Sequence, residues 1–94
     1  MIRNYSTVEN DTELEILRDE GRVSKLIVYK DERHSFNCYV EWLEKICGHA
    51  KQDAIACATV IDYKGMCIVK HGSYDVLKVM CYALEKEGFV VEIR

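Results

Sequence analysis

Hydrophobic residues recur along the chain from Lys25 onward in patterns that separate strands from helices. Residues 25–30 form a short run rich in β-branched side chains, and Asp31 and Glu32 end it, so this run predicts a strand that leads into a loop. From Phe36 the apolar positions lie at offsets of 0, 3, 4, 7, 10 and 11. This spacing is that of one face of an α-helix and predicts a helix over residues 36–47.

Capping residues support the boundaries of this helix and of a second one. Ser35 stands at the N-cap position of the first helix, and Gly48 provides a left-handed residue at its end. The second helix is predicted over residues 51–64, with Gly65 closing it. Its start is weakly encoded, because Ala50 occupies the cap position and has no hydrogen-bonding side chain.

The last third of the chain predicts a strand, a third helix and a final strand. Residues 66–70 are strand-like, and His71 and Gly72 are interpreted as a turn. Ser73 would cap a helix that runs up to Gly88, and residues 89–93 alternate as in a strand. The order β-α-α-β-α-β predicts an α/β fold of the α+β two-layer sandwich type, in which three helices cover one face of a three-stranded sheet.

The chain divides at about residues 21–24, where an acidic segment with little pattern gives way to periodic structure. Between Val8 and Glu20 there are six acidic residues against Arg18 alone, which is typical of a solvated arm. We therefore expect residues 1–24 to be a flexible acidic N-terminal extension and residues 25–94 to be one domain.

Charge and hydropathy exclude several classes of partner. The formal net charge is −3 and the basic residues are scattered, so nothing predicts nucleic-acid binding. No run approaches the about 18 apolar residues of a membrane span, and the N-terminus lacks a secretory signal.

The five cysteines are an odd number without a C-x-x-C pair, which indicates free thiols and a cytoplasmic location.

Cysteine and histidine occur together but not at metal-site spacing. His34 and Cys38 lie near the start of the predicted first helix, whereas Cys47 and His49 flank its end, so the two pairs are too far apart to share an ion. We expect no metal and no cofactor. No nucleophile elbow or phosphate-binding loop is present, so an enzyme is not indicated.

Three carboxylates suggest a site for a cation. Asp31 and Glu32 either solvate the loop and favour the helix that follows, or form an acidic lip. Asp62 supports the second interpretation, because it follows the apolar Ile61 on the second helix and would lie at the edge of an apolar surface.

The segments LIVYKDE (26–32), VEWLEKICGH (40–49) and VIDYKG (60–65) resemble the core of the ClpS family of Clp protease adaptors. The likeness covers about residues 25–94, and the spacing from Asp31 to Gly65 matches without a gap. The resemblance implies the β-α-α-β-α-β fold already indicated by periodicity. It also implies an adaptor, not an enzyme, that binds the N-terminal residue of a substrate protein (an N-degron, usually Leu, Phe, Tyr or Trp) and delivers it to a Clp AAA+ unfoldase and its peptidase.

The resemblance also implies positions for the ligand. Contacts to the substrate α-amine fall on Lys30, Asp31 and Asp62, where the family has Asn, Asp and His. The residues that would line the pocket for the side chain are His34, Phe36, Tyr39, Ala58, Ile61 and Val90. Ala58 replaces a bulkier residue and would deepen the pocket, whereas Tyr39 replaces a smaller one and would narrow it.

Three hypotheses follow. The first is recognition of N-degrons, with Asp31 and Asp62 accepting charge-assisted hydrogen bonds from the ligand ammonium. The second is a ClpS-like protein with an altered pocket that docks on the unfoldase but recognises other cargo or modulates the unfoldase. Lys30, whose ammonium repels that of a ligand, and Asp62 favour this hypothesis. The third is a thiol enzyme that uses Cys47 or Cys38.

Overall fold

The computed structural model describes residues 23–94. The predicted extension therefore lies, except for its last two residues, outside the described part of the chain. The elements follow the order β1 (Ser24–Tyr29), α2 (Phe36–Cys47), α3 (Lys51–Lys64), β2 (Met66–Gly72), α4 (Tyr74–Lys86) and β3 (Val90–Ile93). This is the predicted β-α-α-β-α-β order.

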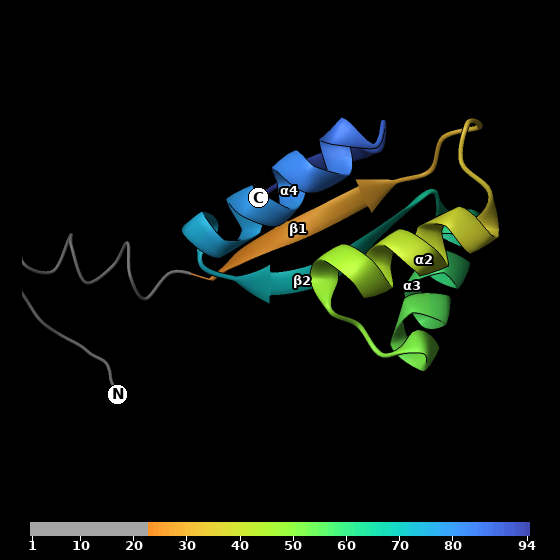
Figure 1. Cartoon of the computed structure of the whole chain (residues 1–94), viewed down its shortest axis with the longest axis horizontal. Coiled ribbons are helices and arrows are strands. Elements are labelled where there is room, and N and C mark those ends of the chain that lie inside the picture. Colours follow the sequence, from red (N-terminus) through yellow and green to blue (C-terminus); the bar gives the residue numbers. More distant parts are fainter. Residues whose placement is uncertain (1–22) are drawn as a thin grey trace, which may run out of the picture.

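The three strands form an antiparallel sheet in the order β2-β1-β3, so the first strand of the domain lies in its centre. Burial follows from this position, since Leu26, Ile27 and Val28 of β1 are each no more than 2% exposed. Figure 1 shows α4 running along the sheet and α2 beside α3.

Local capping explains why the helices begin and end where they do. The Ser35 side chain accepts a hydrogen bond from the backbone of Cys38, and Ser73 does the same for Val76 at the start of α4. Ala50 caps α3 without any side-chain hydrogen bond, as expected from its methyl group. Gly65 ends α3 with φ of 89°, a left-handed conformation that a residue with a Cβ adopts only at a cost.

All three helices contribute to one core on the same face of the sheet. Its buried members come from every element except β3, together with the residue before β3: Leu26, Val28, Tyr39, Val40, Leu43, Cys47, Ala54, Ala58, Ile61, Val69, Leu77, Leu84 and Phe89. The other four cysteines, at positions 38, 57, 67 and 81, are free thiols packed against this core.

Several predicted boundaries were wrong; the first strand, for example, spans Ser24–Tyr29 and not residues 25–30. His71 and Gly72 are the last residues of β2 and not a turn, because they pair with Lys25 and Ser24 of β1. β3 begins at Val90, one residue later than predicted, and α4 ends at Lys86 because the backbone of Glu87 leaves the helix. The end of β2 differs because pairing with β1, which is distant in sequence, decides it.

Candidate functional site

The site lies where the loop after β1, the first turns of α2 and the last turns of α3 meet. Lys30 directly follows β1, and its backbone N–H donates to the carbonyl oxygen of Gly65 at 2.8 Å. This bond fastens the end of β1 to the end of α3. It thereby places the Lys30 side chain beside Asp62, which is one turn before Gly65.

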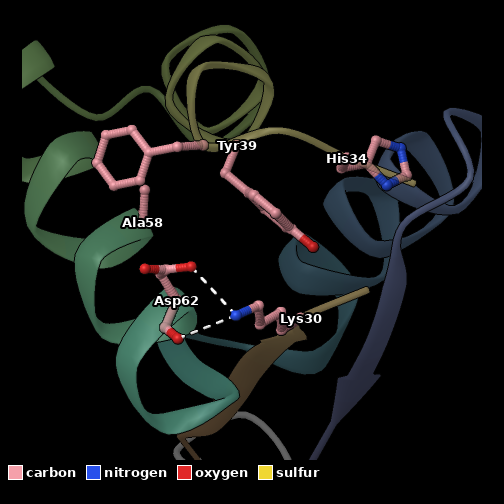
Figure 2. A pocket seen from close by; sticks show the side chains of 6 residues that line it. Lys30, His34, Tyr39, Ala58 and Asp62 are labelled. Carbon is pink, nitrogen blue, oxygen red and sulfur yellow. Dashed lines mark hydrogen bonds and ion pairs between the residues drawn. The ribbon is translucent and has the colours of Figure 1, made fainter. Parts of the chain in front are cut away.

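Lys30 and Asp62 form an ion pair. The Lys30 ammonium (Nζ) is 3.1 Å from the Asp62 carboxylate and also donates to the Asp62 backbone oxygen at 3.2 Å, as Figure 2 shows. Both side chains remain accessible, with 47% and 64% of their surface exposed. Such an exposed pair contributes about 0–1 kcal/mol to stability.

Asp31 is held by hydrogen bonds from its own loop. Its carboxylate accepts hydrogen bonds from the backbone N–H groups of Arg33 at 2.8 Å and His34 at 3.1 Å, and from the ring nitrogen Nδ1 of His34 at 2.9 Å. Burial alone would raise the pKa of Asp31, but the hydrogen bonds from His34 and Arg33 outweigh it and leave the pKa lowered. Asp31 is therefore a carboxylate whose acceptor positions are largely taken.

His34 connects the loop after β1 to the turn between α4 and β3. Its second ring nitrogen, Nε2, lies 2.9 Å from the backbone oxygen of Glu87, and its ring stacks on Phe89 with centroids 3.9 Å apart. Both nitrogens thus face acceptors, so only the doubly protonated ring donates both hydrogen bonds. Arg33 adds a parallel link, because its guanidinium donates to the Gly88 oxygen at 2.6 Å.

Tyr39 of α2 fills the space between these groups. Its side chain is 4% exposed, and Figure 2 shows it pointing between Lys30 and His34. The hydroxyl accepts a hydrogen bond from the Asp31 N–H at 2.9 Å and donates to the Tyr29 carbonyl at 3.3 Å. The ring is thereby fixed among the residues predicted to line the pocket.

A small cavity remains at the centre of the site, with a volume of about 30 Å³. Six of the predicted site residues line it: Lys30, His34, Phe36, Tyr39, Ala58 and Asp62. A cavity of this size holds about one water molecule. Pockets for small organic ligands are roughly ten times larger or more.

The other three predicted site residues lie outside this cavity lining. Asp31 faces His34, and Ile61 is completely buried in the core. Val90 is 47% exposed and lies in register with Tyr29, on the face of the sheet opposite to the core-facing Val91.

Two residues at the site were not anticipated from the sequence. Phe89 stacks on His34 and also contacts Tyr39, with ring centroids 5.2 Å apart, and Arg33 reaches Gly88. Both contacts join segments more than fifty residues apart. No local sequence signal marks such a contact. The one hint is that Phe89 directly follows Gly88, as in a chain that turns back into the core.

The thiols and histidines offer little for catalysis or metal binding. Within residues 23–94 there is no group of three or more His, Cys, Asp or Glu side chains that could hold a metal ion. Burial raises the pKa of Cys38, and raises that of Cys47 to about 11, so neither thiol is activated as a nucleophile. The described helices also include none long and apolar enough to cross a membrane.

Comparison with known proteins supplies the family. The model of the family described as "ATP-dependent Clp protease adaptor protein ClpS" matches residues 19–91, which is most of the chain. The chain is a member of the ClpS family. No curated protein sequence matches it.

A solved structure shows the same fold. Agrobacterium tumefaciens ClpS2, determined with bound L-phenylalaninamide, superposes with a TM-score of 0.66 over 77% of this chain and 96% of the ClpS2 chain. The sequence identity is 14%, so the similarity establishes the fold and not the ligand. As a ClpS-family protein, the chain is an adaptor for the Clp protease and acts by binding, without catalysis of its own.

Proposed function

We propose that this ClpS-family adaptor docks on a Clp AAA+ unfoldase while its own side chains occupy the site for a cargo N-terminus. The ion pair between the Lys30 ammonium and the Asp62 carboxylate, at 3.1 Å, is the observation that carries the proposal. The adaptor then recognises other cargo or modulates the unfoldase.

The carboxylates expected to receive a ligand ammonium already have partners. Asp62 is paired with Lys30, and Asp31 accepts hydrogen bonds from His34 and from two backbone N–H groups. An incoming α-ammonium would compete with Lys30 for Asp62, and with His34 and two backbone N–H groups for Asp31. It would also meet the charge of Lys30, because like charges at short range repel.

The space for a ligand side chain is also restricted. The cavity of about 30 Å³ is closed on one side by Tyr39, which is buried and bonded through its hydroxyl to the backbone of both Asp31 and Tyr29. Admitting a Leu or Phe side chain requires Tyr39 to leave this position and break both hydrogen bonds. Ala58 provides room on the α3 side, but the volume present accommodates no more than a methyl-sized group or a water molecule.

A second candidate function is recognition of N-degrons, with Lys30 displaced by the ligand. The exposure of the Lys30–Asp62 pair favours it, since a pair with 47% and 64% exposed side chains is held by little free energy. If Lys30 turned toward solvent on its long stem, the Asp62 carboxylate would be free to accept the ammonium. Binding of L-phenylalaninamide by the structurally similar ClpS2 gives this candidate a precedent.

One experiment separates the two candidates. The full chain is immobilised and tested for retention of a Clp unfoldase. In parallel, peptides that begin with Phe, Leu, Tyr or Trp are titrated in solution by fluorescence anisotropy, with free and with acetylated N-termini. The proposal predicts retention of the unfoldase and no preference for the free N-terminus. A free peptide that binds more tightly than its acetylated form would refute it and select N-degron recognition.

A further inference from the structure

The ring of His34 joins two segments of the chain that are more than fifty residues apart. Its Nδ1 lies 2.9 and 3.0 Å from the two carboxylate oxygens of Asp31, in the loop after β1. Its Nε2 lies 2.9 Å from the backbone oxygen of Glu87, in the turn between α4 and β3. The side chains of His34 and Asp31 are only 11% and 14% exposed, so water competes poorly for the contact between them.

The protonation state of the ring decides how many of these contacts are hydrogen bonds. A neutral imidazole has one N–H and one lone pair, so in either tautomer a lone pair faces an acceptor oxygen. The charged ring has two N–H groups and donates to both Asp31 and Glu87. After loss of one proton, the remaining N–H stays at Nδ1, because a carboxylate is a stronger acceptor than a backbone carbonyl. The bond to Glu87 is then lost.

The charged and titratable groups around the ring favour its charged form. They come from the loop, from α2, from the turn before β3 and from the far side of the cavity: Asp31 and Arg33, Tyr39, Glu87, and Lys30 and Asp62. Arg33 opposes a charge on the ring, but its guanidinium is engaged by the Gly88 oxygen at 2.6 Å. Lys30 and Asp62 pair with each other at 3.1 Å. The carboxylate of Asp31 is therefore the charged group in direct contact with the ring.

Asp31 keeps its negative charge in this position. Burial would raise its pKa, but the hydrogen bonds from His34 and Arg33 lower it, so the carboxylate is ionised above about pH 4. An ionised carboxylate in contact with Nδ1 stabilises the charged imidazole.

We propose that His34 is a pH-sensitive latch, which in its charged form fastens the loop after β1 to the turn before β3 and on losing one proton releases the turn. Phe89 packs flat on the ring, with centroids 3.9 Å apart and 17° between the planes. The turn thus presents both a carbonyl oxygen and an aromatic face to His34, and only the contact with the carbonyl depends on the proton.

The latch also shapes the candidate site. His34 and Tyr39 line the cavity, and Phe89 contacts both rings. Release of the turn frees Phe89 to move away from His34 and loosens this wall of the cavity. An effect on cargo rests on the proposed function, whereas the latch itself does not.

The pH dependence has a definite direction. Because the folded chain stabilises the charged ring, the contribution of the latch to stability is present at acidic pH. It is lost as the pH rises through the range in which histidine gives up its second proton, about pH 6 to 8. Below about pH 4, protonation of Asp31 weakens the latch from the other side.

Urea unfolding of the full chain at two pH values tests the latch. Wild type and His34→Gln are compared at pH 5.5 and pH 8.5, and Asp31 is ionised at both. Gln keeps a polar side chain and carries no charge at either pH. The factor by which the substitution increases the equilibrium constant for unfolding should be about tenfold larger at pH 5.5, because a hydrogen bond from a charged donor is then lost. An equal factor at both pH values overturns the proposal.

His71→Gln is the matched control, since His71 is exposed near the end of β2. The factor for this variant should differ by less than about twofold between the two pH values. A change as large as that of His34→Gln would show that the pH dependence does not come from the latch, and would overturn the proposal.

NMR of the wild-type chain gives a second readout. Correlations between the ring nitrogens and ring hydrogens should show both nitrogens of His34 protonated at pH 5.5 and Nδ1 alone protonated at pH 8.5. The backbone amide signals of residues 87–89 should move between these pH values in wild type and stay in place in His34→Gln. A neutral His34 ring at pH 5.5, or the same movement in the variant, overturns the proposal. Neither readout involves cargo, so the latch is tested separately from the proposed function.

Discussion

Replacing Tyr39 by Phe removes one hydroxyl from the candidate site and keeps the ring. The hydroxyl accepts the Asp31 N–H at 2.9 Å and donates to the Tyr29 carbonyl at 3.3 Å, so it joins α2 to both the end of β1 and the loop after it. The ring contact with Phe89, at 5.2 Å between centroids, does not involve the hydroxyl and is retained.

The expected loss of stability follows from these two bonds. A typical hydrogen bond contributes about 0.5–1.5 kcal/mol net, and a backbone donor left without a partner in a buried place costs about 1–3 kcal/mol. Tyr39 is 4% exposed, so water reaches the vacated position poorly. The longer bond to Tyr29 contributes less than the shorter one. We expect the free energy of unfolding to fall by about 1.5–2 kcal/mol and the melting temperature by roughly 10 °C.

Urea unfolding of the full chain, followed by circular dichroism, measures this change. The dependence of the free energy on urea concentration should be unchanged, because the substitution alters the folded state locally. Tyr63→Phe is the matched control, since Tyr63 is 88% exposed, and its stability should stay within about 0.5 kcal/mol of the wild type. If Tyr39→Phe were as stable as Tyr63→Phe, the hydroxyl would not hold the loop, and Tyr39 would be free to leave the cavity.

Four further substitutions test other parts of the structure. The pKa of Asp31 is lowered from its ordinary value of 3.8, so the Asp31 carboxylate stabilises the fold above that pH, and this contribution is lost as the pH falls through the folded-state pKa. The difference in unfolding free energy between wild type and Asp31→Asn should therefore shrink below pH 4. A difference that stays constant down to pH 2 would contradict the role given to the Asp31 carboxylate. Ala50→Ser gives α3 the side-chain cap that it lacks and should raise the free energy of unfolding in urea by about 1 kcal/mol. Ser73→Ala removes the cap of α4 and should lower it by about as much. If both variants were as stable as wild type, these caps would contribute little. Gly65→Ala should cost about 1 kcal/mol, because Gly65 has φ of 89°, and an unchanged urea midpoint would contradict this.

Elements with local signals were predicted closely. The bounds of α2 and α3 agree with the sequence because Ser35, Gly48 and Gly65 fix them through bonds within a few residues. The end of β2 was wrong because His71 and Gly72 resemble a turn locally, and only their partners in β1 extend the strand.

The sequence predicted which residues make up most of the candidate site, but not how their side chains are arranged. The resemblance brought together six residues that line one cavity. It did not indicate that Asp31 would turn toward His34 or that Phe89 would stack on His34, because both depend on contacts between distant segments and on side-chain rotamers. The direction of Lys30 was equally open, since its long side chain reaches either solvent or Asp62.

Occupation of the site by Lys30 and Tyr39 is the central claim, and one titration tests it most directly. A fluorescent peptide that begins with Phe, free or acetylated at its N-terminus, is titrated with wild type, with a Lys30→Asn/Tyr39→Val double variant, and with Lys45→Asn. The last variant removes an exposed lysine that pairs with Glu41 at 3.0 Å on α2, and circular dichroism confirms that each chain is folded.

We predict that wild type and Lys45→Asn bind both peptides equally weakly. The double variant should bind the free peptide at least about tenfold more tightly than the acetylated one, because the ammonium then gains a charge-assisted bond to Asp62. A wild-type chain that already prefers the free peptide, or a folded double variant without any preference, would contradict the claim.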